Sequence, residues 1–235
     1  MGSNTVSQRR QGLSVADLGI VQRPSPNCGP RRDGLIPKLI VIHCTAMHSA
    51  GAALERLCDP DAEVSAHYLI SGSGNVVQMV DEEMRAWHAG AGEWHGEADI
   101  NSRSIGIELD NRGDHPFSQP QMVALEVLLR GIMERWDIPA SGVIGHSDMA
   151  PGRKSDPGPR FDWARLARQG LAASSGGVEG PQVQDFSGFR EAAVQAGYTA
   201  DVGDAVLLEA VRLRYRPYAS GPLSPADFTP LGDCS

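Results

Sequence analysis

A histidine, a lysine and an aspartate lie close together on one segment, His146–Pro159, where they could act on a substrate. Four residues that restrict or redirect the backbone are spread through this segment: Pro151, Gly152, Pro157 and Gly158. They favour a loop of fixed shape, which would hold His146, Lys154 and Asp156 in a fixed relation. A histidine and a carboxylate are two of the three protein ligands that an open zinc site needs.

His43 is the candidate for the third ligand. The apolar, β-branched run Leu39–Ile42 predicts a buried strand that ends at His43, and Val143–Gly145 predicts another that ends at His146. Both histidines would then lie at the carboxyl ends of strands, where open α/β sheets usually build their sites. From the residues alone, a pair of ordinary hydrogen-bonded histidines remains the alternative.

Glu108 and Lys154 could complete a hydrolytic site. The strand predicted over Ile105–Leu109 delivers Glu108 to the same rim of the sheet, where a carboxylate could take a proton from an activated water. Lys154 could stabilise negative charge that develops on a carbonyl oxygen. The alternatives are a solvated glutamate and a solubilising surface lysine.

Two rival chemistries depend on other residues. His88 and His95, in the Trp- and Gly-rich loop over 86–102, could form a second metal pair, but no carboxylate on a rigid element accompanies them. We therefore expect this loop to line a substrate cleft. Cys44 could act as a nucleophile, but strand alternation turns it away from His43, so a buried structural cysteine is favoured.

The elements that must position these residues predict an α/β fold. Residues 67–70 and 76–80 flank a Gly-rich loop and predict a hairpin. Ser118 and Gln121 have the spacing of a capping box before an amphipathic helix over 122–136, and a further helix is predicted over 162–168. Strands interleaved with helices indicate a central mixed β-sheet flanked by helices.

Composition shifts divide the chain. Residues 172–177 are small and predict a linker, and two short helices are predicted after it, over 186–196 and 205–215. Four parts follow: a mobile, proline-containing N-terminal arm (1–35), a catalytic domain (36–171), a linker (172–184) and a small helical module (185–235).

The charge and hydropathy of the chain exclude some classes of protein. A formal net charge of −8 over 235 residues argues against a nucleic-acid partner, and no apolar run is long enough to span a bilayer. The first residues do not form a signal peptide, and the four cysteines contain no CxxC pair: Cys28, Cys44, Cys58 and Cys234. We expect a cytoplasmic location. The cell envelope or secretion is the alternative if a leader is missing, and the sequence does not determine the oligomeric state.

Five segments in family order resemble the zinc-dependent N-acetylmuramoyl-L-alanine amidases of the AmpD and AmiD type, which share their fold with peptidoglycan recognition proteins. The segments are 42–47, 65–70, 85–90, 104–109 and 145–159. Ala66 stands where phage amidases carry a tyrosine, which is similar to the AmpD and AmiD branch. The tail over 181–235 weakly resembles a helical peptidoglycan-binding module, and a purely structural role is the alternative.

The resemblance implies a role for each candidate residue. One zinc ion would bind His43, His146 and Asp156, with Glu108 as the catalytic carboxylate and Lys154 supporting the transition state. Substrate would meet three further residues: His67, Trp87 and His88. The implied reaction is hydrolysis of the amide between N-acetylmuramic acid, or its 1,6-anhydro form, and L-alanine. Soluble muropeptides and intact peptidoglycan both remain open as substrates. A non-catalytic peptidoglycan-binding protein on the same fold is the alternative, although such proteins usually lack a metal ligand.

Overall fold

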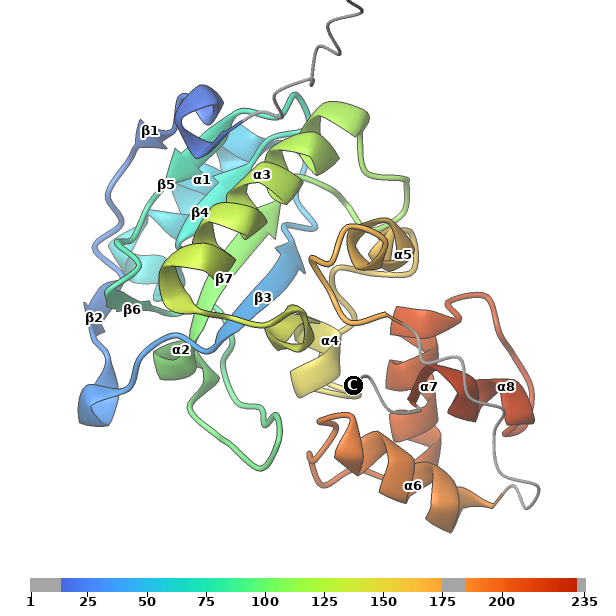
Figure 1. Ribbon diagram of the computed structural model, residues 1–235. Helices are drawn as coiled ribbons and strands as arrows, with labels where there is room; N and C mark the ends of the chain where they lie inside the picture. The colour runs from blue at the N-terminus through green and yellow to red at the C-terminus, as the bar shows by residue number, and fades with distance from the viewer. Residues whose placement is uncertain (1–13, 175–184, 232–235) are drawn as a thin grey trace, which may run out of the picture.

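A six-stranded mixed sheet forms the centre of the protein (Figure 1). The computed structural model describes residues 14–174 and 185–231. The strands follow the order β1 (Val21–Gln22), β5 (Val76–Gln78), β4 (Tyr68–Ile70), β7 (Ser104–Leu109), β3 (Leu39–Cys44) and β8 (Val143–Gly145). Only the β4–β5 hairpin is antiparallel among these pairs, and the other neighbours are parallel. The predicted mixed sheet and hairpin are confirmed.

The helices lie around this sheet and at one end of it (Figure 1). The α-helices are α1 (Ala50–Leu57), α2 (Ile100–Arg103), α3 (Gln119–Trp136), α4 (His146–Met149), α5 (Trp163–Ala167), α6 (Phe186–Gln195), α7 (Asp204–Tyr215) and α8 (Pro225–Phe228). The short 3-10 turns are η1 (Val15–Leu18), η2 (Arg32–Gly34), η3 (Pro60–Ala62), η4 (Ala140–Gly142) and η5 (Thr229–Leu231). None of the described helices has both the length and the apolar character that crossing a membrane requires.

The two faces of the sheet carry different kinds of side chain. One face carries the isoleucines of β3 and β7, which pack with Leu125 and Leu128 of α3 in a closed apolar core. Strand alternation turns the intervening residues to the other face, and the parallel register places His43 beside Glu108 there. The first face is therefore packed in this core, and the second carries the candidate site next to apolar residues such as Val41.

Ser118 is the N-cap of helix α3, as predicted, but only half of the predicted capping box forms. The Ser118 hydroxyl accepts a hydrogen bond from the Gln121 backbone N–H at 3.2 Å. The Gln121 side chain does not return this bond; its amide donates to the Ile70 carbonyl at 2.9 Å. The capping box was a wrong prediction in this respect, because the Gln121 amide is buried beside the strand ends and donates there, to the Ile70 carbonyl and to the Asp110 carbonyl at 3.2 Å.

Part of the predicted mobile arm is ordered. Strand β1 pairs in parallel with β5 at the edge of the sheet, and β2 (Cys28–Pro30) pairs antiparallel with β6 (Met84–Ala86). Short strands can form beside prolines at a sheet edge, where a missing N–H leaves no ladder bond unmade. The expected mobility therefore does not hold for residues 21–30, and residues 1–13 lie outside the described part.

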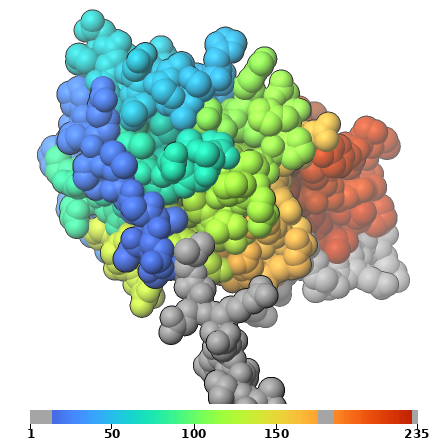
Figure 2. Space-filling view, turned by 90° about the horizontal axis from the view of Figure 1, so that it is seen from above, coloured from blue at the N-terminus to red at the C-terminus, as the bar shows by residue number. Residues whose placement is uncertain are grey.

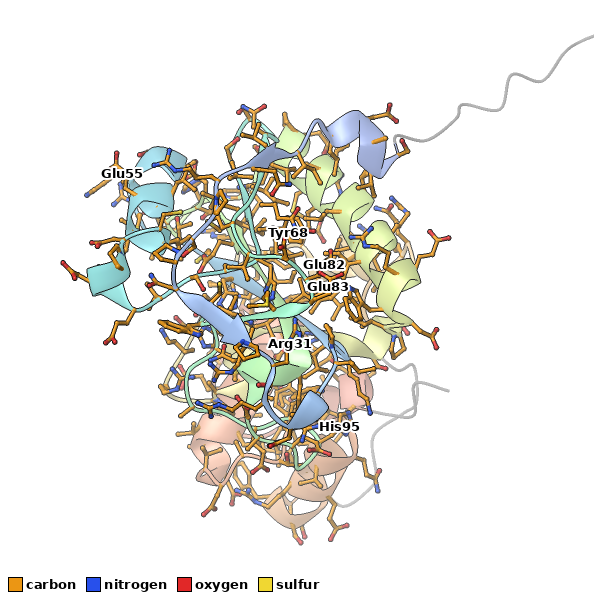
Figure 3. The ribbon with its side chains drawn as sticks, turned by 90° about the vertical axis from the view of Figure 1, so that its left-hand side faces the viewer. Arg31, Glu55, Tyr68, Glu82, Glu83 and His95 are labelled. Carbon is orange, nitrogen blue, oxygen red and sulfur yellow. The ribbon has the colours of Figure 1, made fainter. Side chains whose placement is uncertain are left out.

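Glu82 connects α3 to the hairpin. Its carboxylate accepts hydrogen bonds from the Tyr68 hydroxyl at 2.7 Å, from Arg135 at 2.6 and 3.0 Å, and from the Trp136 indole at 2.6 Å. Figure 3 shows Glu82 next to Tyr68 in the interior. Every oxygen of this buried carboxylate has donors, so it stabilises the packing of α3 on the sheet.

The C-terminal helices form a second unit against the end of the sheet where α4 lies (Figure 1), and Figure 2 shows their atoms gathered at one side of the molecule. Val41 and Ile144 of the sheet share one apolar cluster with Phe189, Leu207 and Val211 of this unit. Ala172, the first residue of the predicted linker, is buried in the core of the catalytic domain. Residues 175–184 of the predicted linker lie outside the described part. The two units are therefore joined by a common core.

Candidate active site

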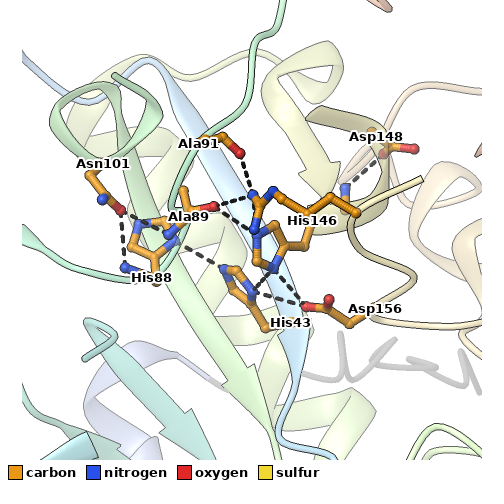
Figure 4. A network of polar contacts seen from close by, with 10 residues as sticks. His43, His88, Ala89, Ala91, Asn101, His146, Asp148 and Asp156 are labelled. Atoms are coloured by element: carbon orange, nitrogen blue, oxygen red, sulfur yellow. Dashed lines mark hydrogen bonds and ion pairs between the residues drawn. The ribbon is translucent and has the colours of Figure 1, made fainter. Parts of the chain in front are cut away.

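Three ligand atoms converge at the edge of the sheet (Figure 4). His43 Nδ1 lies 2.9 Å from His146 Nδ1 and 3.0 Å from Asp156 Oδ2, and the last two atoms are 3.1 Å apart. His43 ends the apolar part of β3, His146 begins α4 directly after β8, and Asp156 lies on the loop that follows. In the described part of the chain, no other group of three His, Cys, Asp or Glu side chains could hold a metal ion.

The hydrogen bonds of His146 determine where its proton lies. Its Nε2 is 2.9 Å from the Ala89 carbonyl oxygen, which can only accept. The proton of the neutral ring is therefore on Nε2, and Nδ1 presents a lone pair to the cluster.

A longer chain of hydrogen bonds determines the proton of His43. The Ser104 hydroxyl donates to the Ile100 carbonyl at 2.6 Å, so its oxygen accepts from His88 Nε2 at 3.2 Å. His88 Nδ1 then has a lone pair, which accepts from His43 Nε2 at 3.0 Å. His43 Nδ1 is left without a proton. Burial, followed by the nearby His146, lowers the pKa of His43 to about 4, which keeps its ring neutral at pH 7.

Two imidazole lone pairs and one carboxylate oxygen thus face one another with no proton between them. Three acceptors at about hydrogen-bond distance repel unless a cation lies among them. Neutral imidazole and carboxylate are preferred ligands of several divalent metals. The residues that the structure brings together therefore fit a metal ion, held by His43, His146 and Asp156.

Gly106 makes room for this arrangement. A Cβ atom at Gly106, in the middle of β7, would lie 2.5 Å from the His88 ring. Any larger residue would push His88 away from His43, so the glycine is required for close approach. The His88 ring is thus packed on the sheet beneath His43, besides lining the cleft as predicted.

Glu108 lies beside the ligands with an unused oxygen. Its Oε2 is buried and has no hydrogen-bond partner among the described residues. Burial, followed by the charge of Asp156, raises the pKa of Glu108 to about 8, although the nearby Lys154 offsets part of the effect. A carboxyl group with such a pKa can both take up and release a proton near neutral pH.

An open cleft of about 820 Å³ lies over these residues. Seven of the eight predicted site residues line it: His43, Trp87, His88, Glu108, His146, Lys154 and Asp156. Four cationic side chains also line it: Arg56, Arg112, Arg153 and Lys154. This gathering of positive charge, on a chain whose formal net charge is −8, favours an anionic ligand.

His67 lies elsewhere. It is fully buried, its Nδ1 accepts from the Gly106 N–H at 2.9 Å, and its Nε2 donates to the Met84 carbonyl at 3.1 Å. Both ring nitrogens are occupied by β7 and β6, and the ring does not line the cleft. The geometry does not support the predicted contact with substrate, and instead makes His67 a link between two strands.

The two rival chemistries find no support. His95 is exposed and belongs to no metal-binding group of the described residues. Cys44 is only partly buried and lines the cleft, but burial and then the charges of Asp156 and Glu108 raise its pKa to about 12. Its thiol therefore stays protonated at neutral pH and is a poor nucleophile.

Asn101 is a site residue that the sequence did not indicate. Its side-chain oxygen accepts from the backbone N–H groups of His88 at 3.0 Å and Ala89 at 2.8 Å (Figure 4). It therefore fixes the turn that carries His88 and the Ala89 carbonyl, which hold the two metal-site histidines. No periodic pattern could have indicated Asn101, because its partners are distant in sequence.

A mixed α/β domain with three converging acceptors at a strand edge that could hold a metal ion, and a carboxyl group of raised pKa beside them, has the arrangement expected of a hydrolase. Residues 33–159 match the Amidase_2 family, described as N-acetylmuramoyl-L-alanine amidase, and the chain belongs to this family. The resemblance found in the sequence is confirmed.

Relatives of known name agree with this assignment. The chain is 38% identical to N-acetylmuramoyl-L-alanine amidase AmiD of Escherichia coli (strain K12) over 179 residues, which cover 68% of this chain and 64% of AmiD. It is 36% identical over 166 residues to 1,6-anhydro-N-acetylmuramyl-L-alanine amidase AmpD of the same organism, covering 63% of this chain and 91% of AmpD.

Solved structures match both units. AmiD from E. coli, in complex with the substrate anhydro-N-acetylmuramic acid-L-Ala-D-gamma-Glu-L-Lys, superimposes with a TM-score of 0.74 at 31% identity, covering 89% of this chain and 90% of that chain. AmpDh3 from Pseudomonas aeruginosa, in complex with anhydromuramic pentapeptide, gives a TM-score of 0.70 at 28% identity, covering 97% and 96%. The predicted fold class is confirmed, C-terminal helices included.

Proposed function

We propose that the protein is a zinc-dependent amidase that hydrolyses the amide bond between N-acetylmuramic acid, or its 1,6-anhydro form, and L-alanine in peptidoglycan fragments. One observation carries the proposal: three proton-free ligand atoms converge beside a glutamate with an unused oxygen. This arrangement stands in an open cleft of a chain that belongs to the amidase family.

Zinc is the metal that suits this ligand set. Two imidazole nitrogens and one carboxylate oxygen are the ligands of many hydrolytic zinc sites, and three protein ligands leave a position free. His43, His146 and Asp156 would hold the ion. When bound, zinc would polarise the scissile carbonyl and make a water molecule more acidic.

The proton transfers fall to Glu108. Its carboxylate would take a proton from the attacking water and return it to the amine nitrogen of the leaving L-alanine. The raised pKa of Glu108 suits the return of the proton, and the positive charge of a bound ion would lower that pKa so that the carboxylate could first take the proton up. Lys154, at the exposed rim of the cleft, would stabilise negative charge on the carbonyl oxygen.

The substrate is inferred from the charge of the cleft and from the relatives. Four cations line the cleft, and the stem peptide of peptidoglycan carries carboxylates that they could attract. The ligands named in the AmiD and AmpDh3 structures are anhydromuramic acid joined to peptides. We infer that a muramoyl peptide of this kind occupies the cleft, with Trp87 and His88 in its wall.

A non-catalytic binding protein on the same fold is the second candidate. Nothing in the described site favours it, since all three metal ligands and Glu108 are present and brought together.

The proposal is tested by incubating zinc-loaded protein with an anhydromuramoyl tripeptide and, separately, with intact peptidoglycan, and identifying the products by mass. We expect the free sugar and an intact peptide that begins with L-alanine. Metal-stripped protein is the control and should be inactive until zinc is restored. Binding without cleavage, or cleavage of a different bond, would overturn the proposal.

A further inference from the structure

The C-terminal unit contacts the helix that carries a metal ligand. Asp148, the third residue of α4, is 1% exposed. Its Oδ1 accepts from the Tyr198 hydroxyl at 2.8 Å, and its Oδ2 accepts from Arg214 at 2.5 Å. Both donors belong to the C-terminal unit. A buried carboxylate without such partners would be strongly destabilising.

Arg214 holds both ends of the turn from β8 into α4. Besides Asp148, its guanidinium donates to the Val143 carbonyl, at the first residue of β8, at 3.1 Å. It also lies over the Trp163 ring, 4.0 Å from the centroid. Arg214 is 5% exposed, and its planar guanidinium makes contacts that a single ammonium group could not reproduce.

Helix α4 in turn holds two of the three metal ligands. His146 is its first residue, and the Ser147 N–H donates to the Asp156 carbonyl at 2.9 Å. A shift of α4 would therefore move His146 directly and Asp156 through its backbone. Ligand geometry tolerates errors of only about 0.5 Å, so a shift of this size would weaken metal binding.

The rest of the interface holds the C-terminal unit close to the ligand loop. A Cβ atom on Gly152 would lie 2.8 Å from Val206 of α7, and one on Gly197 would lie 2.5 Å from the Trp94 ring. Trp94 also packs edge-on against Tyr198, with ring centroids 4.9 Å apart. Such close contacts leave no space for the unit to turn while it stays docked.

We propose that Arg214 and Tyr198 are positioning residues for the metal site: through Asp148 they hold α4, and with it His146 and Asp156, in the geometry that binds the ion. The C-terminal unit is then a structural part of the hydrolytic site. This inference rests on the proposed function only in that it takes His146 and Asp156 as zinc ligands.

The main test is the zinc affinity of Arg214→Met, measured on metal-free protein by competition with a fluorescent chelator, well below the unfolding temperature. Loss of a residue that orients metal ligands typically weakens metal binding by about 10- to 100-fold, and we expect a weakening in that range. With zinc saturating, kcat should fall while KM stays within about threefold, because Arg214 does not line the catalytic cleft.

Arg212→Met is the matched control. Arg212 pairs with Asp227, a fully buried carboxylate, and its other bonds go to the Gly221 and Pro222 carbonyls, so all of them lie within the C-terminal unit. We expect this variant to lower the melting temperature but to leave zinc affinity unchanged. Equal losses of zinc affinity in both arginine variants would mean that Arg214 only stabilises the fold, and would overturn the proposal.

Tyr198→Phe decides the matter if Arg214→Met does not fold. It removes one hydroxyl and one hydrogen bond to Asp148, and we expect zinc to bind several-fold more weakly. Wild-type affinity in a folded Tyr198→Phe or Arg214→Met protein would overturn the proposal. Failure of the proposed function would look different: a wild-type protein that binds no zinc, or that binds it without cleaving muramoyl peptides.

Discussion

Glu82 and Glu108 are glutamates of the same domain whose buried carboxyl oxygens differ in their hydrogen-bond donors and whose pKa values shift in opposite directions. Burial alone would raise the pKa of Glu82, but donors from Arg135, Tyr68 and Trp136 outweigh it and hold that pKa below its usual range. Glu108 has no donor for its buried Oε2 among the described residues, and its pKa is raised to about 8. One carboxylate is fully satisfied, and the other is not.

The difference separates structural from chemical use of a buried charge. A carboxylate whose acceptor sites are all occupied lowers the free energy of the folded state and cannot easily exchange a proton. A carboxyl group left without a donor costs stability but can transfer a proton at neutral pH. The group formed by His43, His146 and Asp156 resembles Glu108 in this respect, because its three acceptors lack a donor until a cation binds.

The largest effect is expected from Asp156→Ala, which removes one of the three converging acceptors. We expect the variant to lose its zinc and to have no measurable turnover, because two histidines alone hold the ion weakly. Metal content per chain and the rate of muramoyl-peptide hydrolysis measure this. Asp114→Ala is the control, since Asp114 lines the same cleft but pairs only with Arg112 and His115. Full turnover by metal-stripped Asp156→Ala protein would refute the site.

Glu108→Gln separates proton transfer from metal binding. The amide keeps the shape of the side chain but cannot accept the proton of water, so we expect zinc to remain while kcat falls at least ~10²-fold. Stability should not decrease, because no hydrogen bond to Oε2 is lost. An unchanged rate would remove Glu108 from its proposed role.

Glu82→Gln should show the reverse profile. The uncharged amide no longer balances Arg135, and we expect the free energy of unfolding to fall by about 2 kcal/mol. Its kcat, measured at a temperature where the protein is folded, should stay within about twofold. Urea denaturation and steady-state kinetics on the same samples measure both quantities. A large loss of kcat with unchanged stability would break the contrast between the two glutamates.

The effect that is smallest at neutral pH concerns His67, a buried group outside the cleft. Burial lowers its pKa from 6.5 to about 3. Between these values the unfolded chain binds a proton that the folded protein does not, so stability is complete above pH 6.5 and is lost as the pH falls. His67 should contribute about 1.4 kcal/mol per pH unit in this window. Denaturation at several pH values should show a shallower slope for His67→Asn, and an equal slope would contradict the assignment.

Local patterns predicted the elements and the ends at which the site is built. Alternation and apolar runs placed β3, β7 and β8, and helical spacing placed α3, because these periods reflect which face of an element is buried. The same patterns predicted His43 and His146 at strand ends, and the proline- and glycine-rich loop predicted that Asp156 would be near. The family resemblance then supplied their roles.

The substrate contact that the family resemblance implied for His67 is not supported by the structure. His67 lies directly before a strand that borders the site, but its ring turns into the interior and bonds to Gly106 and Met84. Asn101 and the His88–Ser104 pair were missed for the same reason: the partners of a polar side chain come from distant parts of the sequence. The prediction of a mobile arm was also wrong for residues 21–30, because β1 and β2 pair with β5 and β6.

The sequence by itself thus determined the mixed α/β class, the family and the candidate ligands His43, His146 and Asp156, because short motifs at strand ends carry these residues and the family resemblance relates motifs that lie far apart. Only the tertiary structure decided which nitrogen of each histidine faces Asp156, that no described residue donates to Glu108 Oε2, and that Arg214 reaches α4 from the C-terminal unit. Proton positions, pKa values and docking depend on neighbours brought together by folding, and no local pattern records them.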